Sequence, residues 1–183
     1  MKNLFKKWLK GDEAVAAIEA GFLFPVMLLM MLGTIDVGMG LTISQKVINS
    51  CNTFADLLAR QTDADGVNNA DLSDAYTGAQ LVIGPYSLTP FQYDAVGIQF
   101  VGATLTPTAI WRATCKMTAN ASAVTNAAGL GAQNEGVIAV TVKYIYTPVF
   151  TSFVTGNFNM QEVSYARGRK GGFVIRTGNT TPC

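Results

Sequence analysis

The sequence predicts an α+β protein in which a long N-terminal transmembrane and amphipathic helix precedes a small domain with an antiparallel β-sheet. Three observations support this prediction. An apolar run covers residues 14–35, broken only by Glu19 and Thr34, and an amphipathic helical pattern continues beyond it. Short runs after residue 90 alternate apolar and polar residues, as strands do. Because no long helical pattern separates those runs, antiparallel pairing is favoured.

The composition and the charge distribution indicate an exported protein with a basic leader. Of the 183 residues 49% are hydrophobic and 14% charged, and the net charge of +1 gives no reason to expect nucleic acid as a partner. Residues 1–14 hold four of the 13 basic residues and two of the 12 acidic ones, so the remainder carries a net charge of −1. This asymmetry predicts a cytoplasmic leader over residues 1–14 and export of the rest of the chain.

The apolar run is long enough to cross a membrane. Its 22 residues extend roughly 33 Å as a helix at about 1.5 Å per residue. A cleavable secretory signal has a shorter apolar core, and no Ala-x-Ala site follows this run. Apolar residues then recur every three or four positions at Ile43, Val47, Cys51, Phe54 and Leu58. We therefore expect one spine helix over residues 15–61, with Pro25 inside it.

The remainder, residues 62–183, is expected to form a periplasmic α+β domain. A short amphipathic helix is predicted over Ala70–Ile83, with Asn69 or Asp71 as its cap. We expect residues 118–134 to be a loop, because they are rich in Ala, Asn, Thr and Gly. The strand candidates are Val96–Phe100, Ala109–Cys115, the run from Gly136 that ends at Pro148, Gln161–Arg167 and Phe173–Thr177.

The order of these features resembles the TadE-like pseudopilins of tight-adherence (Flp-type) pilus systems. Glu19 is followed six residues later by Pro25, and then by "GTIDVG" over Gly33–Gly38. The later segments "GVIAVTVKYIYTPVF" and "SYARGRKG" are similar to those of the alphaproteobacterial members. The chain departs from the family pattern at Ala20, where an aromatic residue is usual. The resemblance implies a non-catalytic role in pilus assembly, with the major pilin, a second pseudopilin, membrane platform proteins and the prepilin peptidase as partners.

The resemblance also implies processing of the leader. Prepilin peptidases of this family cut after a Gly and leave the Glu as fifth residue of the mature chain. Counting back from Glu19 places the cut after Ala14, with Val15 as the new first residue. The nearest Gly is Gly11, and a cut there would begin the mature chain at Asp12 and leave the Glu as eighth residue.

In such filaments the Glu can pair with the freed α-amino group of a neighbouring subunit, so that two unfavourable charges satisfy each other. The alternative is that Glu19 lies shallow in an uncleaved signal anchor. The resemblance assigns helix packing to Pro25, Gly33, Asp36 and Gly38 as well. For Asp36, at the far end of the run, solvation at the membrane interface is a sufficient explanation.

The three cysteines are consistent with an oxidising compartment. Cys51 lies on the apolar stripe of the spine helix and is expected to be a packed thiol. A Cys115–Cys183 disulfide is favoured because a free chain end frays unless it is fastened. Free thiols and a bridge to Cys51 remain open. No Cys-x-x-Cys pattern suggests a redox or zinc site.

Catalysis has little support in the sequence. The chain has no His, which excludes Ser-His, Cys-His and His-metal arrangements. The acidic stretch Asp63–Asp74 has Gly66 at its fourth position rather than the sixth, so we interpret it as a solvated turn rather than a calcium loop. The basic residues near the C-terminus, among them Arg167, Arg169 and Arg176, are interpreted as a solvated surface. We expect no enzyme activity, no cofactor and no metal.

The sequence thus predicts a minor pilin or pseudopilin in the bacterial inner membrane, with a single pass, a cytoplasmic N-terminus and a periplasmic C-terminal domain. It takes part in assembly of a thin adhesive pilus, in the filament, at its tip or from the membrane. One alternative is a periplasmic ligand- or partner-binding domain on an ordinary uncleaved signal anchor. A secreted domain cleaved after about residue 38 is another.

Overall fold

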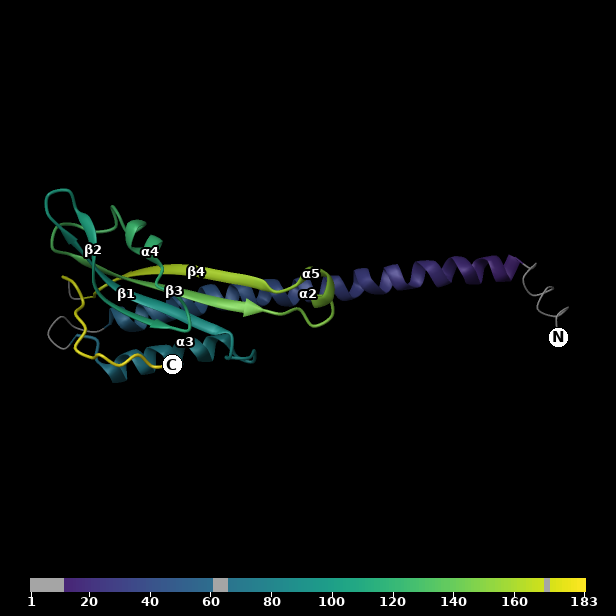
Figure 1. The fold of residues 1–183 in the computed structure, drawn as a ribbon, viewed down its shortest axis with the longest axis horizontal. Helices are drawn as coiled ribbons and strands as arrows, with labels where there is room; N and C mark the ends of the chain where they lie inside the picture. The colour runs from purple at the N-terminus through teal and green to yellow at the C-terminus, as the bar shows by residue number, and fades with distance from the viewer. Residues whose placement is uncertain (1–11, 61–65, 170–171) are drawn as a thin grey trace. The chain divides into compact units, whose positions relative to one another are not determined.

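The computed structural model describes residues 12–60, 66–169 and 172–183 (Figure 1). Four strands form one sheet in the order β2-β1-β3-β4, and every neighbouring pair is antiparallel. The predicted α+β class with an antiparallel sheet is therefore confirmed. The elements in chain order are α2 (Asp12–Ala59), α3 (Asn69–Ile83), β1 (Phe91–Val101), β2 (Thr106–Cys115), α4 (Ala121–Thr125), β3 (Gly136–Tyr146), α5 (Ser152–Thr155) and β4 (Phe158–Arg167).

The chain divides into two compact units, and α2 contributes to both. The first unit contains α2 up to Gly40 together with Thr147–Asn157, the segment that connects β3 to β4 and includes α5. The second unit contains Leu41–Tyr146 and Phe158–Cys183, and so holds the whole sheet.

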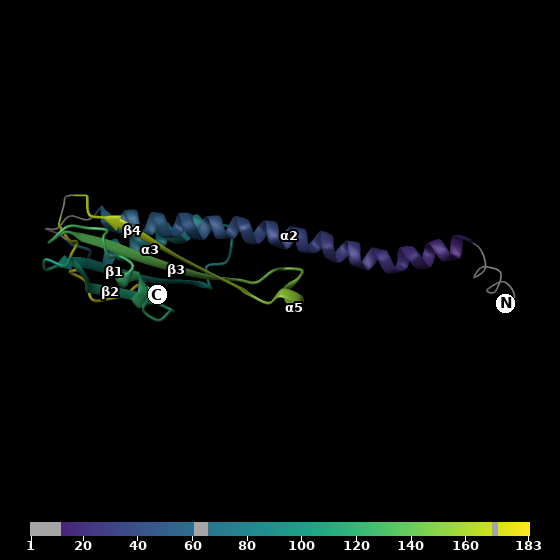
Figure 2. The ribbon, with the colours of Figure 1, turned by 90° about the horizontal axis from the view of Figure 1, so that it is seen from above.

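Within the second unit, α3 and the part of α2 after Leu41 cover one face of the sheet (Figure 2). Phe54 of α2 is fully buried, and its ring meets that of Tyr93 of β1 edge to face, with centroids 5.0 Å apart. The two helices are also joined by a hydrogen bond of 2.7 Å from Ser50 Oγ to the carbonyl of Ala79. The apolar stripe predicted for α2 is thus its core-facing side: Ile43, Val47, Cys51 and Leu58 are all buried.

The opposite face of the sheet has its own apolar cluster. Val96, Ile98 and Phe100 of β1 pack there with Ala123 and Ala127 of the segment after β2. That segment lies within residues 118–134, which were expected to be a loop, and the expectation is wrong for α4. Small residues allow a short helix to approach the strands closely here, although the composition suggests irregular structure.

Two further local predictions are corrected. The N-cap of α3 is Asn68, one residue before Asn69 and three before Asp71, the two expected positions. Its side chain accepts hydrogen bonds from the backbone N–H groups of Ala70 and Asp71, while the Asp71 carboxylate accepts from the Asn68 N–H. Phe173–Thr177 is not a strand, because its only pairing in the described chain is an isolated bridge between Val67 and Arg176. A run with strand-like residues still needs a partner backbone with free hydrogen-bonding groups along its length.

Candidate functional site

The N-terminal part of α2 exposes a continuous apolar surface. Every residue from 15 to 31 is exposed. The helix is long and apolar enough to cross a membrane, and none of its most apolar window is buried against the rest of the structure. An exposed apolar surface of this length has no stable arrangement in water, so α2 is consistent with a single-pass membrane anchor. Its large apolar side chains include Phe22, Leu23, Phe24, Met27, Met30 and Met31.

The residues expected to guide processing and assembly lie on this helix. Ala14 and Val15 are inside α2, and the helix continues through Pro25. Glu19 is exposed, and its side chain has no hydrogen-bond or ion-pair partner in the described part of the chain. The alternative cleavage position, Gly11, lies outside the described residues, whereas Asp12 is the first residue of α2. The carboxylate of Glu19 is therefore open to contact with another molecule.

Asp36 is held by the chain itself, not by solvent. Its side chain is only 3% exposed. Its carboxylate accepts hydrogen bonds from three consecutive backbone N–H groups, those of Val149 at 3.1 Å, Phe150 at 3.0 Å and Thr151 at 2.6 Å. The hydroxyl of Thr151 adds a fourth at 2.8 Å. The prediction that solvation at the membrane interface is enough to explain a carboxylate at position 36 is therefore wrong.

The chemistry of this contact explains its strength. Thr151 is the N-cap of α5, and Val149 and Phe150 precede it, so the carboxylate of Asp36 accepts from three successive N–H groups of the turn that leads into the helix. Charge-assisted hydrogen bonds of this kind are shorter and stronger than neutral ones. Of the other predicted packing residues, Gly33 also faces this segment, since a Cβ there would lie 3.9 Å from Cγ2 of Thr151. Gly38 has open space around it. No sequence signal pointed to the partner of Asp36, because backbone N–H groups have no side-chain signature.

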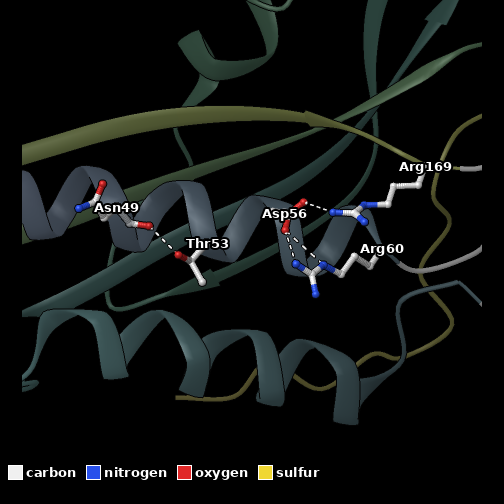
Figure 3. A network of polar contacts seen from close by, with 5 residues as sticks. All are labelled: Asn49, Thr53, Asp56, Arg60 and Arg169. Atoms are coloured by element: carbon white, nitrogen blue, oxygen red, sulfur yellow. Dashed lines mark hydrogen bonds and ion pairs between the residues drawn. The ribbon is translucent and has the colours of Figure 1, made fainter.

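The end of α2 carries a small ion-pair network in the second unit (Figure 3). Asp56 pairs with Arg60 one turn later at 2.7 Å and with Arg169, beyond β4, at 2.9 Å. All three side chains are well exposed, so the network contributes little to stability. It nevertheless gives an intramolecular partner to Arg169, one of the basic residues interpreted as a solvated surface.

The cysteines divide into one bonded pair and one buried thiol. Cys115, at the end of β2, is bonded to Cys183, and their Cα atoms are 5.6 Å apart. This is the pairing that the sequence favoured. The thiol of Cys51 is buried and donates a hydrogen bond to the Val140 carbonyl at 3.1 Å. Burial raises the pKa of Cys51 to about 12, so the group stays protonated and unreactive.

A buried carboxylate and a polar recess lie in the second unit. Asp94 is fully buried, accepts a hydrogen bond of 2.7 Å from the Asn120 N–H and lies 3.5 Å from Nε of Arg112. Burial raises the pKa of Asp94, although Asn120 and Arg112 oppose the shift. The recess nearby, of about 570 Å³, has Lys116 and Lys143 in its lining. Neither the recess nor the Asp94 cluster pairs a nucleophile with a base, and no group of metal-ligating side chains occurs among the described residues.

The comparisons with known proteins give one positive result. No match was found among curated proteins, and none among solved structures. The TadE-like protein family model, however, matches residues 14–52, a segment that includes Glu19, Pro25, Asp36 and the exposed apolar part of α2. Residues 14–52 are thus similar to the TadE-like protein family, which confirms the resemblance inferred from Glu19, Pro25 and the Gly33–Gly38 segment.

Proposed function

We propose that the protein is a membrane-anchored minor pilin or pseudopilin that takes part in assembly of a thin, adhesive Tad-type pilus. The observation that carries the proposal is the TadE-like match over residues 14–52 on a helix whose first half is apolar and exposed. TadE-like proteins are typically not enzymes, and the role proposed here is packing rather than chemistry.

The proposed organisation reflects the charge pattern. The leader, residues 1–14, stays in the cytoplasm because of its four lysines. The spine helix over residues 15–61 crosses the bacterial inner membrane once, and residues 62–183 form the periplasmic domain. The Cys115–Cys183 bond supports this orientation, since disulfides persist in the oxidising periplasm. The proposed partners are the major pilin, a second pseudopilin, the membrane platform and the prepilin peptidase.

The proposed mechanism is lateral packing of α2 with other pilin helices, guided by Glu19. Cleavage after Ala14 would free a cationic amine on Val15, close to the membrane. Because Glu19 is exposed and unpaired within the described chain, its carboxylate is available to the amine of a neighbouring subunit. An unpaired charge at this depth costs a few kcal/mol, so mutual neutralisation favours one register of neighbouring helices.

Mass spectrometry of the mature N-terminus, in cells with and without the prepilin peptidase, tests this proposal. We expect a peptidase-dependent start at Val15. A peptidase-dependent start at Asp12 would keep the class of protein but overturn the proposed register of Glu19. An intact N-terminus in both strains would favour a binding domain on an ordinary signal anchor, and a start near residue 38 would favour a secreted domain.

A Glu19→Gln variant tests the pairing separately from the processing. The change keeps the size of the side chain and removes its charge, so we expect normal cleavage but loss of pilus assembly. An Asp56→Asn variant, which changes an exposed carboxylate on the same helix outside the apolar run, is the matched control and should assemble normally. Normal assembly of Glu19→Gln would refute the charge-pairing mechanism.

A further inference from the structure

We propose that the segment Thr147–Asn157, here called the interfacial loop, inserts into the lipid headgroup region beside the transmembrane helix. The inference goes beyond the pilin role, but it rests on the proposed membrane anchoring of residues 14–35. It gives the periplasmic leaflet a second contact with the protein, in addition to α2.

The composition of the interfacial loop suits a lipid interface. Between Thr147 and Asn157 there is no Asp, Glu, Lys or Arg, and the other residues are apolar or hydroxyl-bearing apart from one Gly. Two of its large apolar side chains face outward: Val149 is 66% exposed and Phe150 is 42% exposed. Aromatic and aliphatic side chains beside small polar groups are typical of protein that lies in the headgroup region.

Asp36 determines the depth of this loop. The apolar run of α2 ends at Ile35, so a helix that crosses the bilayer with this run places Asp36 at its interface. The backbone nitrogens of Val149, Phe150 and Thr151 lie 2.6–3.1 Å from the Asp36 carboxylate. The loop and the end of the membrane span belong to the same compact unit, so the loop is fixed at the level where the span leaves the bilayer.

Lipid is a better occupant for this surface than a second protein. A stable protein interface buries about 800 Å² on each partner, far more than the exposed parts of Val149 and Phe150 supply. The exposed side chains of the loop instead belong to the same compact unit as the end of the apolar run of α2, where Ile35 and Val37 are also exposed. A bilayer that covers the apolar surface of α2 therefore also reaches Val149 and Phe150 of the loop, without a further partner.

Depth-dependent fluorescence quenching of the full-length protein in vesicles of phosphatidylethanolamine and phosphatidylglycerol tests the proposal. An environment-sensitive dye is attached at Val149→Cys in a Cys51→Ala background, where Cys115 and Cys183 are blocked by their bond. Met27→Cys reports on the span, and Leu81→Cys on α3 is an exposed apolar reference in the second unit. Quenchers are lipids with a nitroxide at shallow or deep positions, and aqueous iodide.

The expected result is quenching at position 149 by shallow nitroxides, at position 27 by deep nitroxides, and at position 81 by iodide. Iodide quenching at position 149 with lipid quenching at position 27 would overturn the loop proposal and leave the anchoring intact. Loss of lipid quenching at position 27 would overturn the anchoring itself. Protection of position 149 from every quencher, relieved by diluting the protein in lipid, would overturn the proposal in favour of a second copy.

A substitution of Asp36 provides the second arm. Asp36→Ala removes the acceptor of four hydrogen bonds, so shallow-nitroxide quenching at position 149 should be lost while deep-nitroxide quenching at position 27 is unchanged. Asp56→Ala is the matched control, since it removes a carboxylate of α2 whose ion pairs among the described residues are with Arg60 and Arg169. Undiminished quenching in the Asp36→Ala variant would refute the role of Asp36 in setting the depth of the loop.

Discussion

Breaking the Cys115–Cys183 bond should destabilise the second unit more than any single exposed contact that it contains. The bond joins residues 68 positions apart, and so closes a loop that includes β3 and β4. In the chain-entropy model, a closed loop of this length lowers the entropy of the unfolded chain enough to contribute about 4 kcal/mol to the free energy of unfolding. When the bond is broken, the tail keeps noncovalent contacts, such as the hydrogen bond from the Tyr93 hydroxyl to the Pro182 carbonyl, but these do not restrict the unfolded chain.

Urea unfolding of the full-length protein in detergent, followed by tryptophan fluorescence, measures this effect. Trp111 is a suitable reporter because its indole N–H donates to the Val174 carbonyl of the C-terminal segment at 2.6 Å. With a urea dependence of about 2 kcal/mol per molar, the loss corresponds to a fall in midpoint of about 2 M.

The reasoning predicts a specific pattern among variants. Reductant should lower the midpoint of the wild type and of Cys51→Ala equally, because the latter retains the bond. The Cys115→Ala/Cys183→Ala variant should resemble the reduced protein and should not respond to reductant. Equal midpoints for oxidised and reduced wild type would refute the loop-closure argument and show that the bond fastens only a fraying end.

The buried ionisable groups give two further predictions. Burial raises the pKa of Cys51 to about 12. Alkylation of the native thiol by iodoacetamide at about pH 8 should therefore be at least three orders of magnitude slower than alkylation of the unfolded protein in urea. Mass spectrometry measures both rates, and equal rates would contradict the burial of the thiol. Burial also raises the pKa of Asp94 above its ordinary value of 3.8. The folded protein therefore holds this proton more tightly than the unfolded chain, and the stabilisation is fully present below pH 3.8 and is lost as pH rises through the raised pKa. The free energy of unfolding of the wild type relative to Asp94→Asn should therefore fall as pH rises through this window, and a rise in urea titrations would contradict the assignment.

Much of the fold was predictable because side-chain periodicity reports burial directly. The apolar stripe Ile43, Val47, Cys51, Phe54 and Leu58 became the core-facing side of α2. The alternation in β3 likewise placed one set of side chains on each face of the sheet, and packed elements cover both faces. Where periodicity is weak the predictions failed. The small residues around α4 and the strand-like run Phe173–Thr177 have patterns that do not specify their partners.

The sequence by itself determined the local patterns of this protein: a basic N-terminal segment, an apolar run with Glu19 near its start, an α+β remainder and, over residues 14–52, the similarity to the TadE-like family. Local hydrophobicity and charge are sufficient for those features, since each depends on neighbours along the chain. Only the tertiary structure decided the role of Asp36, because its partners lie 113 to 115 residues away and are mostly backbone N–H groups. A carboxylate that looks solvated in the sequence is thus the group that holds the β3–β4 connection to α2, and only folding brings the two together.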